Sequence, residues 1–365
     1  MMIRPRDVPV PARVPLLVAG FAALITGVLA GLWRLGWPVP PFAAGAPHGV
    51  LVLCGFFGTL IGLERAVAIG AWWAYAGPLS SATAGLLALA GGSEQLAGAL
   101  FVAGGMIMVM ASLRGQKIQP ALHTRVLTLG AACWPAGTLA WMAGTPLAQA
   151  ASAWVAFLVV TIAGERLELS RVLPPSPAMT RLFRILLAVL ISAMAAALAG
   201  WPAGVAVLGI SLALLALWLA RQDVARRTVK GQGLTRYIAL CLLAGYAWLG
   251  LGGVLYAFAG QAPGSVGFDA ALHALLVGFV FSMVFGHAPI ILPAVIRLKL
   301  PFHWGFYLPL VLLHASLALR LAGDALGDFT LRSTGALGNG LAIGLFLLTV
   351  VGTAAGHALF RRSRH

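Results

Sequence analysis

Residues 267–296 read GFDAALHALLVGFVFSMVFGHAPIILPAVI, and this stretch decides the fold. It holds one formal charge, Asp269, although about 20 apolar helical residues already suffice to cross a bilayer. The rest of the chain is similar, since 61% of its 365 residues are hydrophobic and 9% are charged. Soluble domains carry about a quarter charged residues. The composition therefore predicts an all-α, polytopic membrane protein.

Apolar runs of this kind recur along the chain, and they predict a bundle of about twelve transmembrane helices in one integral membrane domain, 1–365. The first run, 15–37, is too long for the apolar part of a signal peptide and is expected to be a retained span. The predicted spans are 14–36, 47–69, 72–91, 94–113, 122–143, 147–169, 179–200, 202–221, 235–260, 267–296, 304–322 and 335–359.

The basic residues predict the orientation. With the N-terminus inside, 21 of the 24 Lys and Arg residues fall on the cytoplasmic side. The exceptions are Arg34, Arg320 and Arg332. This alternation predicts a multi-pass protein of a bacterial-type inner (cytoplasmic) membrane with both termini cytoplasmic. The net charge of +15 is spread over alternate loops, so we expect membrane lipid, and no nucleic acid, as a partner.

A weak internal repeat links the second and tenth segments. Residues 48–52 read HGVLV and residues 273–277 read HALLV, and Phe56 matches Phe281 at the same offset. Such self-similarity is typical of a fold built from repeated modules.

A second short repeat links the second and sixth segments, where 61–65 read IGLER and 162–166 read IAGER. The acid–base pairs in these motifs are expected to form structural ion pairs at cytoplasmic helix ends. Because the related segments are four helices apart, the repeats suggest three four-helix modules, roughly 1–113, 114–230 and 231–365.

Neither cysteines nor most histidines indicate a site. The three cysteines lie in apolar runs without a CxxC pair, so a disulfide framework or a cysteine-bound metal is not expected. Four of the eight histidines are expected to be interfacial or solvated at span ends or in the tail, namely His123, His303, His357 and His365.

His48 and His273 stand near the start of two segments that both run from outside to inside, at similar depth. Ionisable residues within spans are costly and usually functional. Two facing imidazoles at one depth suit six-coordinate haem ligation in a bundle. A hydrogen-bonded helix contact is the alternative. Asp269, four residues before His273, either orients that imidazole or only marks the helix start.

His287 and His314 form a second candidate site. In a straight α-helix His287 lies about 21 Å below His273 and on the same face. His287 and His314 are each about ten residues from the cytoplasmic side, so they could meet as a metal site, a haem site or a hydrogen-bonded pair. Pro289 and Pro293 are expected to kink the helix near His287.

A family resemblance rests on two stretches, HGVLVLCGFFGTLIGLERAVA (48–68) and HALLVGFVFSMVFGHAPIILPAV (273–295). They resemble the NnrS family of haem- and copper-containing membrane proteins linked to nitric oxide stress, and more distantly haem-copper oxidase subunit I. The resemblance implies a haem, b-type by expectation, with His48 and His273 as ligands and His287 as an alternative or additional one. It implies metal ligation by the same histidines, with His314 joining His287 if copper binds.

The departures from an oxidase limit this inference. The sixth and seventh segments hold no histidine, and the cross-linked tyrosine of oxidases has no counterpart, so proton-pumping oxygen reduction is not expected. A role in nitric oxide or respiratory redox metabolism, as a haem-dependent oxidoreductase if the protein is an enzyme, is the first hypothesis. Electrons would come from a quinone or a redox partner protein, since no CxxCH motif is present.

Two other classes of function stay open. A secondary transporter would place its substrate site at the proline-broken tenth helix. A structural or assembly protein without chemistry of its own would fit the scarcity of polar residues in the spans.

Overall fold

A computed structural model describes residues 7–169, 174–259, 262 and 264–362. This part of the chain is all-helical, with 85% helix and no strand, as the composition predicts. Ten of its helices are long and apolar enough to cross a membrane. The protein is therefore a multi-pass helical membrane protein. Arg4, Arg6, Arg171, Arg364 and His365 lie outside the described residues.

Some of these ten segments combine more than one element. They are α1 (Val10–Trp33), His48–Ile69, α5 (Glu94–Ile118), α7 (Leu147–Leu169), α8 (Pro177–Leu198), α9 (Pro202–Gln222), α11 (Gly233–Ala259), Val266–Ile296, Trp304–Leu326 and Phe329–His357. The components and remaining elements are η1 (Pro41–Ala43), α2 (His48–Val50), η2 (Leu51–Phe57), α3 (Gly58–Ile69), η3 (Trp72–Tyr75), α4 (Ala76–Leu89), α6 (Leu122–Met142), α10 (Ala225–Thr228), α12 (Val266–His273), η5 (Ala274–Phe281), α13 (Ser282–Ile296), η6 (Trp304–Phe306), α14 (Tyr307–Leu326) and α15 (Phe329–Arg362).

Two predicted spans form helices that are not among the ten that are long and apolar enough to cross a membrane. In the segment 72–91, α4 has 14 residues and is about 21 Å long, less than the hydrocarbon thickness of about 30 Å. In the segment 122–143, α6 has 21 residues, but it holds His123 and Arg125 and is not among the ten helices that are long and apolar enough. The count of twelve spans stays a prediction.

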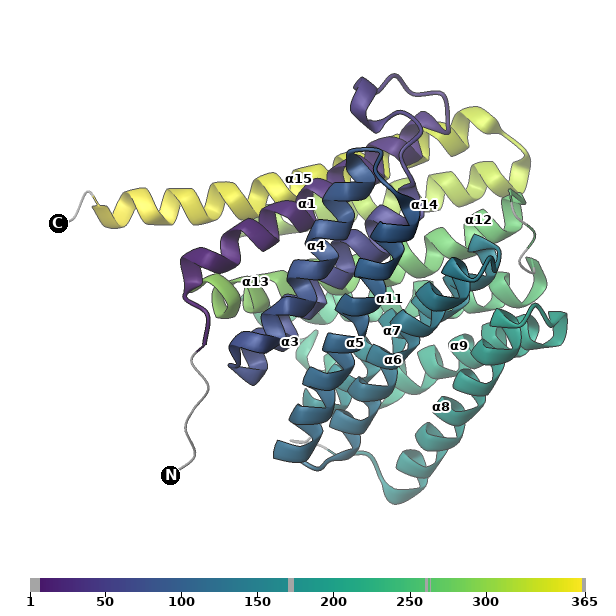
Figure 1. Cartoon of the computed structure of the whole chain (residues 1–365), viewed down its shortest axis with the longest axis horizontal. Coiled ribbons are helices and arrows are strands. Elements are labelled where there is room, and N and C mark those ends of the chain that lie inside the picture. The colour runs from purple at the N-terminus through teal and green to yellow at the C-terminus, as the bar shows by residue number, and fades with distance from the viewer. Residues whose placement is uncertain (1–6, 170–173, 260–261, 263, 363–365) are drawn as a thin grey trace. The chain divides into compact units, whose positions relative to one another are not determined.

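The described helices group into two compact units, Met1–Glu165 and Arg166–His365, and the boundary lies within α7. In Figure 1 the first unit runs from purple to blue and the second from teal to yellow. The three expected modules, 1–113, 114–230 and 231–365, stay a prediction.

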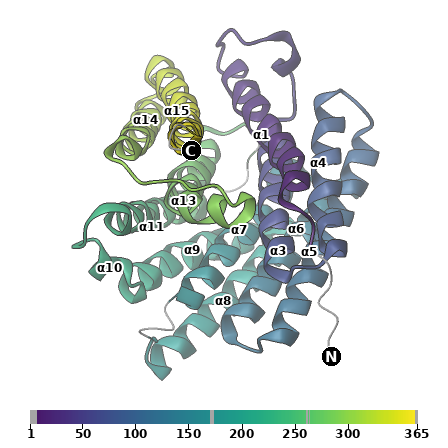
Figure 2. The same ribbon diagram turned by 90° about the vertical axis from the view of Figure 1, so that its left-hand side faces the viewer.

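In the first unit, α1 packs on η2 and α4, and α3 packs on α4 and α5 (Figure 2). The motif Gly58-xxx-Gly62 supplies close approach on α3. A Cβ at Gly58 would lie 2.4 Å from the Trp134 ring, and one at Gly62 would lie 3.4 Å from Pro78. Small residues thus let helices approach where no hydrophobic force drives them together.

In the second unit, α14 and α15 lie side by side, as do α9 and α11 (Figure 1). The contact between α9 and α11 is backbone to backbone. A Cβ at Gly209 would lie 2.4 Å from the Ala257 amide nitrogen, and one at Gly253 would lie 2.6 Å from that of Ala213. These two glycines therefore set the closeness of α9 and α11.

Two candidate spans change helix type shortly after a histidine. The elements η2 and η5 are π-helices of seven and eight residues, with i→i+5 bonds and a wider turn. Every residue of η2 is buried, and so is nearly all of η5. The spacing of an α-helix therefore does not apply between His273 and His287, and the expected shared face does not follow from it.

We predict that Gly253→Ala lowers the melting temperature of the detergent-purified protein. Its methyl group would meet the α9 backbone, and overpacking of this kind costs about 1–3 kcal/mol. The matched control is Gly250→Ala in the same helix, where the nearest atom, Ala216 Cβ, would be 3.7 Å away. The control should be neutral or stabilising, since alanine is the better helix former by about 1 kcal/mol. Equal melting temperatures for the two variants would contradict the close contact.

Candidate functional site

His48 opens the second candidate span and is tied to α1. Its Nδ1 lies 2.5 Å from the carbonyl oxygen of Gly27, and its ring packs on Gly31, where a Cβ would be 3.0 Å from Nδ1. A carbonyl only accepts hydrogen bonds, so Nδ1 carries the proton. The lone pair of the neutral imidazole is therefore on Nε2.

His273 ends α12 and has the same arrangement within its own helix. Its Nδ1 lies 2.7 Å from the carbonyl oxygen of Asp269 and 3.4 Å from the Asp269 carboxylate. The carbonyl is the closer acceptor, and again the lone pair is on Nε2. Asp269 thus contacts the imidazole through both its backbone and its side chain, as the i, i+4 spacing allows.

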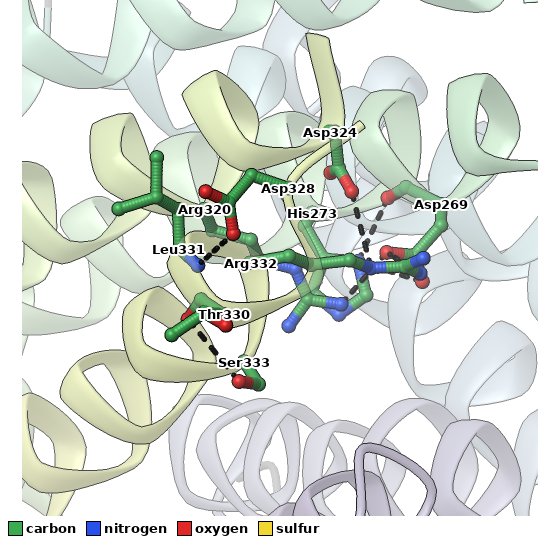
Figure 3. Close-up of polar contacts among 9 residues, drawn as sticks. All are labelled: Asp269, His273, Arg320, Asp324, Asp328, Thr330, Leu331, Arg332 and Ser333. Carbon is green, nitrogen blue, oxygen red and sulfur yellow. Dashed lines mark hydrogen bonds and ion pairs between the residues drawn. The ribbon is translucent and has the colours of Figure 1, made fainter. Parts of the chain in front are cut away.

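Asp269 is held by two arginines from other helices (Figure 3). Its Oδ2 accepts from Arg320 Nη2 at 2.7 Å, and from Arg332 Nη2 at 3.0 Å. Arg332 Nε also lies 3.1 Å from Asp324. The orientation of the carboxylate beside His273 is therefore set by α14 and α15. The sequence signal for this network was available, because Arg320 and Arg332 break the positive-inside pattern.

His287 follows the π-helical η5 within α13. Its Nδ1 donates to the Met283 carbonyl oxygen at 2.7 Å, while its Nε2 is buried and has no hydrogen-bond partner among the described residues. α13 continues through Pro289 and Pro293, which have no N–H to donate to the carbonyls one turn earlier. An unpartnered, buried nitrogen lone pair beside such a segment is a candidate ligand.

His314 differs from the other three. Its Nδ1 accepts from Trp248 Nε1 at 2.9 Å, and its Nε2 lies 3.5 Å from the Ser282 hydroxyl. That hydroxyl donates to the Cys241 carbonyl oxygen at 2.7 Å, so it is free to accept from His314. His314 therefore carries its proton on Nε2, and both nitrogens face protein groups. This arrangement favours the hydrogen-bonded alternative for His314 over ligation.

Three of the four candidates thus share one chemistry. Metal-ligating histidines commonly donate one ring N–H to a backbone carbonyl or carboxylate, which fixes the tautomer and raises ligand basicity. His48, His273 and His287 meet this condition, so they fit a haem or metal ligand. Among the described residues, no group of three or more His, Cys, Asp or Glu side chains gathers as a metal site.

The remaining histidines follow the prediction in part. His303 is exposed and bonds Thr353 Oγ1 at 2.8 Å. His357 is only half-buried. His123 is 4% exposed, which corrects the expectation of a solvated or interfacial histidine. It lies in the first turn of α6.

The predicted ion pairs at helix ends form with other partners. Arg65 lies 3.5 Å from Glu165, so the two IGLER-like motifs are linked to each other. Arg166 instead binds Asp223, with Nε and Nη2 at 2.7 and 2.9 Å from the two carboxylate oxygens. Tyr246 donates to the same carboxylate. Hydropathy had no signal for this buried pair, because Asp223 lies just beyond a span.

Residues 13–355 match a family model described as "Domain of unknown function (DUF8744)". The chain belongs to this family. The match covers the candidate spans from α1 to most of α15, and it includes all four candidate histidines. No curated protein matches this chain.

We predict that Asp269→Asn destabilises the protein by about 3 kcal/mol, because it leaves Arg320 and Arg332 in a partly buried network without their shared carboxylate. Asp328→Asn is the control. Asp328 is an exposed residue that accepts from the Leu331 amide at 3.0 Å, and asparagine caps helices equally well. Thermal unfolding in detergent measures both. A control variant that loses as much stability as Asp269→Asn would contradict the role of the network.

Asp223 predicts a pH dependence. Burial alone would raise the pKa of its carboxyl, but the hydrogen bonds and charge of Arg166, with help from Tyr246, hold that pKa below its ordinary value. A depressed folded-state pKa stabilises the protein above the unfolded pKa of about 3.9 and loses that contribution as the pH falls through the folded value. The melting temperature should therefore exceed that of Asp223→Asn at pH 7, and the difference should shrink below about pH 4. A difference that is constant with pH would contradict this assignment.

Proposed function

We propose that the protein is a haem-binding integral membrane protein of the NnrS-like type, with His48 and His273 as haem ligands and His287 as an alternative or additional ligand. One recurrent observation carries the proposal. In each unit a histidine with its proton on Nδ1 stands directly before, or three residues before, a long π-helix. Such helices are rare and frequently lie at functional sites.

The chain's own residues would prepare the ligands. The Gly27 carbonyl would hold the ring of His48, and the Asp269 carbonyl and carboxylate would hold that of His273, so that the basic lone pair of each neutral ring is on Nε2. A bound haem supplies one-electron transfer, and its potential depends on axial ligands and their hydrogen bonds. The two arginines on Asp269 would hold its carboxylate beside the ligand.

The proposed setting is nitric oxide or respiratory redox metabolism in a bacterial-type inner membrane, with both termini cytoplasmic. The alternation of basic residues supports the orientation. A quinone or a redox partner protein would supply electrons, since the chain has no CxxCH motif. The resemblance to the NnrS family implies a b-type haem. Copper is the less supported cofactor, since both ring nitrogens of His314 face protein groups.

A secondary transporter is the second candidate, and one observation favours it. The buried Nε2 of His287 has no partner among the described residues and lies in a helix with two internal prolines. The prolines leave carbonyls one turn earlier without an intrahelical donor, and ionisable groups within spans commonly mark substrate or proton pathways.

Absorption spectroscopy tests the haem proposal. The protein, expressed with added haem precursor and purified in detergent, should show a Soret band that shifts on reduction. His48→Ala and His273→Ala should each lose haem or change from a six- to a five-coordinate spectrum, because an axial ligand is missing. Added imidazole should restore the spectrum of a variant that still folds.

His303→Ala is the matched control, since His303 is exposed and lies outside the candidate ligand set. It should retain full haem content. Protein that stays colourless after reconstitution with haem would overturn the proposal and favour the transporter. Full haem content with an unchanged spectrum in both ligand variants would refute the ligand assignment.

A further inference from the structure

A cavity of about 530 Å³ lies in the second unit, where α9 ends and α8 begins. Three arginines line it, Arg221 from the last turn of α9 and Arg226 and Arg227 from the short α10. Ser176, which is the N-cap of α8 and lies 45 residues before Arg221 in the sequence, also lines the cavity. None of these residues belongs to the histidine sites.

Local structure explains why the arginines gather there. α9 ends at Gln222, and the Asp223 carboxylate accepts from the Ala225 amide at 2.8 Å, which turns the chain into α10. Arg226 Nη1 donates to the Arg221 carbonyl oxygen at 3.2 Å, so the turn closes on itself. The turn thereby brings residues from both sides of Asp223 to one concave surface.

The charge of this cavity is not neutralised by its own acid. Asp223 also lines the cavity, but its carboxylate is engaged by Arg166 through two hydrogen bonds, and the two side chains are 2% and 6% exposed. Arg221, Arg226 and Arg227 are exposed. Each side chain carries a guanidinium, which is a cation and a donor of up to five hydrogen bonds. The N-terminus of α8, a helix of 22 residues, adds a further partial positive charge.

The cavity also lies at the level where two candidate spans end. α8 begins at Pro177 and α9 ends at Gln222, so both leave the hydrocarbon there and reach the headgroup layer. Arginine binds phosphate oxygens through a planar fork of donors. Basic pockets between spans at the cytoplasmic face bind anionic lipid headgroups.

We propose that this cavity binds a phosphate-bearing anion through Arg221, Arg226 and Arg227. The ligand is either the phosphate of an anionic phospholipid or a soluble phosphate, and the membrane level of the cavity favours the lipid. The positive-inside rule alone requires basic loops. It does not require three arginines around one concavity where the acidic lining residue that the structure describes, Asp223, is already paired.

Native mass spectrometry of the full-length, delipidated protein in neutral detergent tests the proposal. The probes are short-chain phosphatidylglycerol, phosphatidylcholine of the same chain length, and inorganic phosphate. The variant is Arg221→Gln with Arg226→Gln and Arg227→Gln. An arginine near an anionic surface contributes about fivefold in affinity, so the triple variant should bind phosphatidylglycerol roughly 100-fold more weakly.

The matched control removes three other basic charges at span ends, with Arg114→Gln, Lys117→Gln and Arg125→Gln. These exposed side chains lie at the end of α5 and the start of α6. The control should change phosphatidylglycerol affinity less than about threefold, since general surface charge acts weakly and nonspecifically. If the triple variant does not fold, Arg226→Gln and Arg227→Gln are tested singly, with about fivefold expected for each.

The probes separate the two sources of the ligand. Arginine-dependent binding of phosphatidylglycerol over phosphatidylcholine supports the lipid headgroup, and arginine-dependent binding of inorganic phosphate without a lipid preference supports a soluble phosphate. Phosphatidylglycerol and phosphate affinities that are equal in the wild type and the triple variant would overturn the proposal. An equal loss in the control variant would also overturn it, because the effect would then belong to net charge.

Discussion

Hydrocarbon holds no water, so polar groups within a span must find hydrogen-bond partners inside the protein. His48, His273 and His287 meet this requirement by the same means, a bond from Nδ1–H to a backbone carbonyl. That bond has a chemical consequence beyond lowering the cost of burial. It fixes the tautomer and leaves the basic lone pair of the neutral ring on Nε2. In His314 the roles of the two nitrogens are reversed, because Nδ1 accepts from Trp248 and Nε2 faces the Ser282 hydroxyl. His314 is therefore less suited to ligation.

The π-helices depend on the same requirement. An i→i+5 pattern keeps backbone groups bonded within the segment while widening the turn, so it is permitted where an irregular loop in lipid would not be. Its occurrence after both His48 and His273 gives the weak HGVLV/HALLV repeat a structural counterpart in two separate units. A wider turn alters which side chains share a helix face with the histidine. Nearly all residues of both π-helices are buried.

Much of this fold could be predicted from hydropathy, because long apolar runs leave few alternatives to membrane-spanning helices. The start of a helix at His48 was also predictable from the preceding proline. The π-helices were not, since their Leu, Val, Gly and Phe residues suit an α-helix equally well. The departure of Arg320 and Arg332 from the positive-inside pattern was visible in the sequence. Their pairing with Asp269 was not, because they are 51 and 63 residues away and pairing depends on packing. The short α4 shows the limit of counting apolar runs.

Two aspartate–arginine networks flank α11, which has 27 residues and is about 40 Å long. Asp223 precedes it and Asp269 follows it, so the networks lie at its opposite ends. Buried ion pairs add little net stability, but breaking one is costly, so they select one arrangement of helices over others. Each network also leaves a chemical consequence beside it. Asp269 contacts the candidate ligand His273. Asp223 is paired with Arg166, so its charge does not offset the three arginines that line the same cavity. The same kind of ion pair therefore supports both proposals, the haem ligand His273 at one end of α11 and the anion-binding cavity at the other.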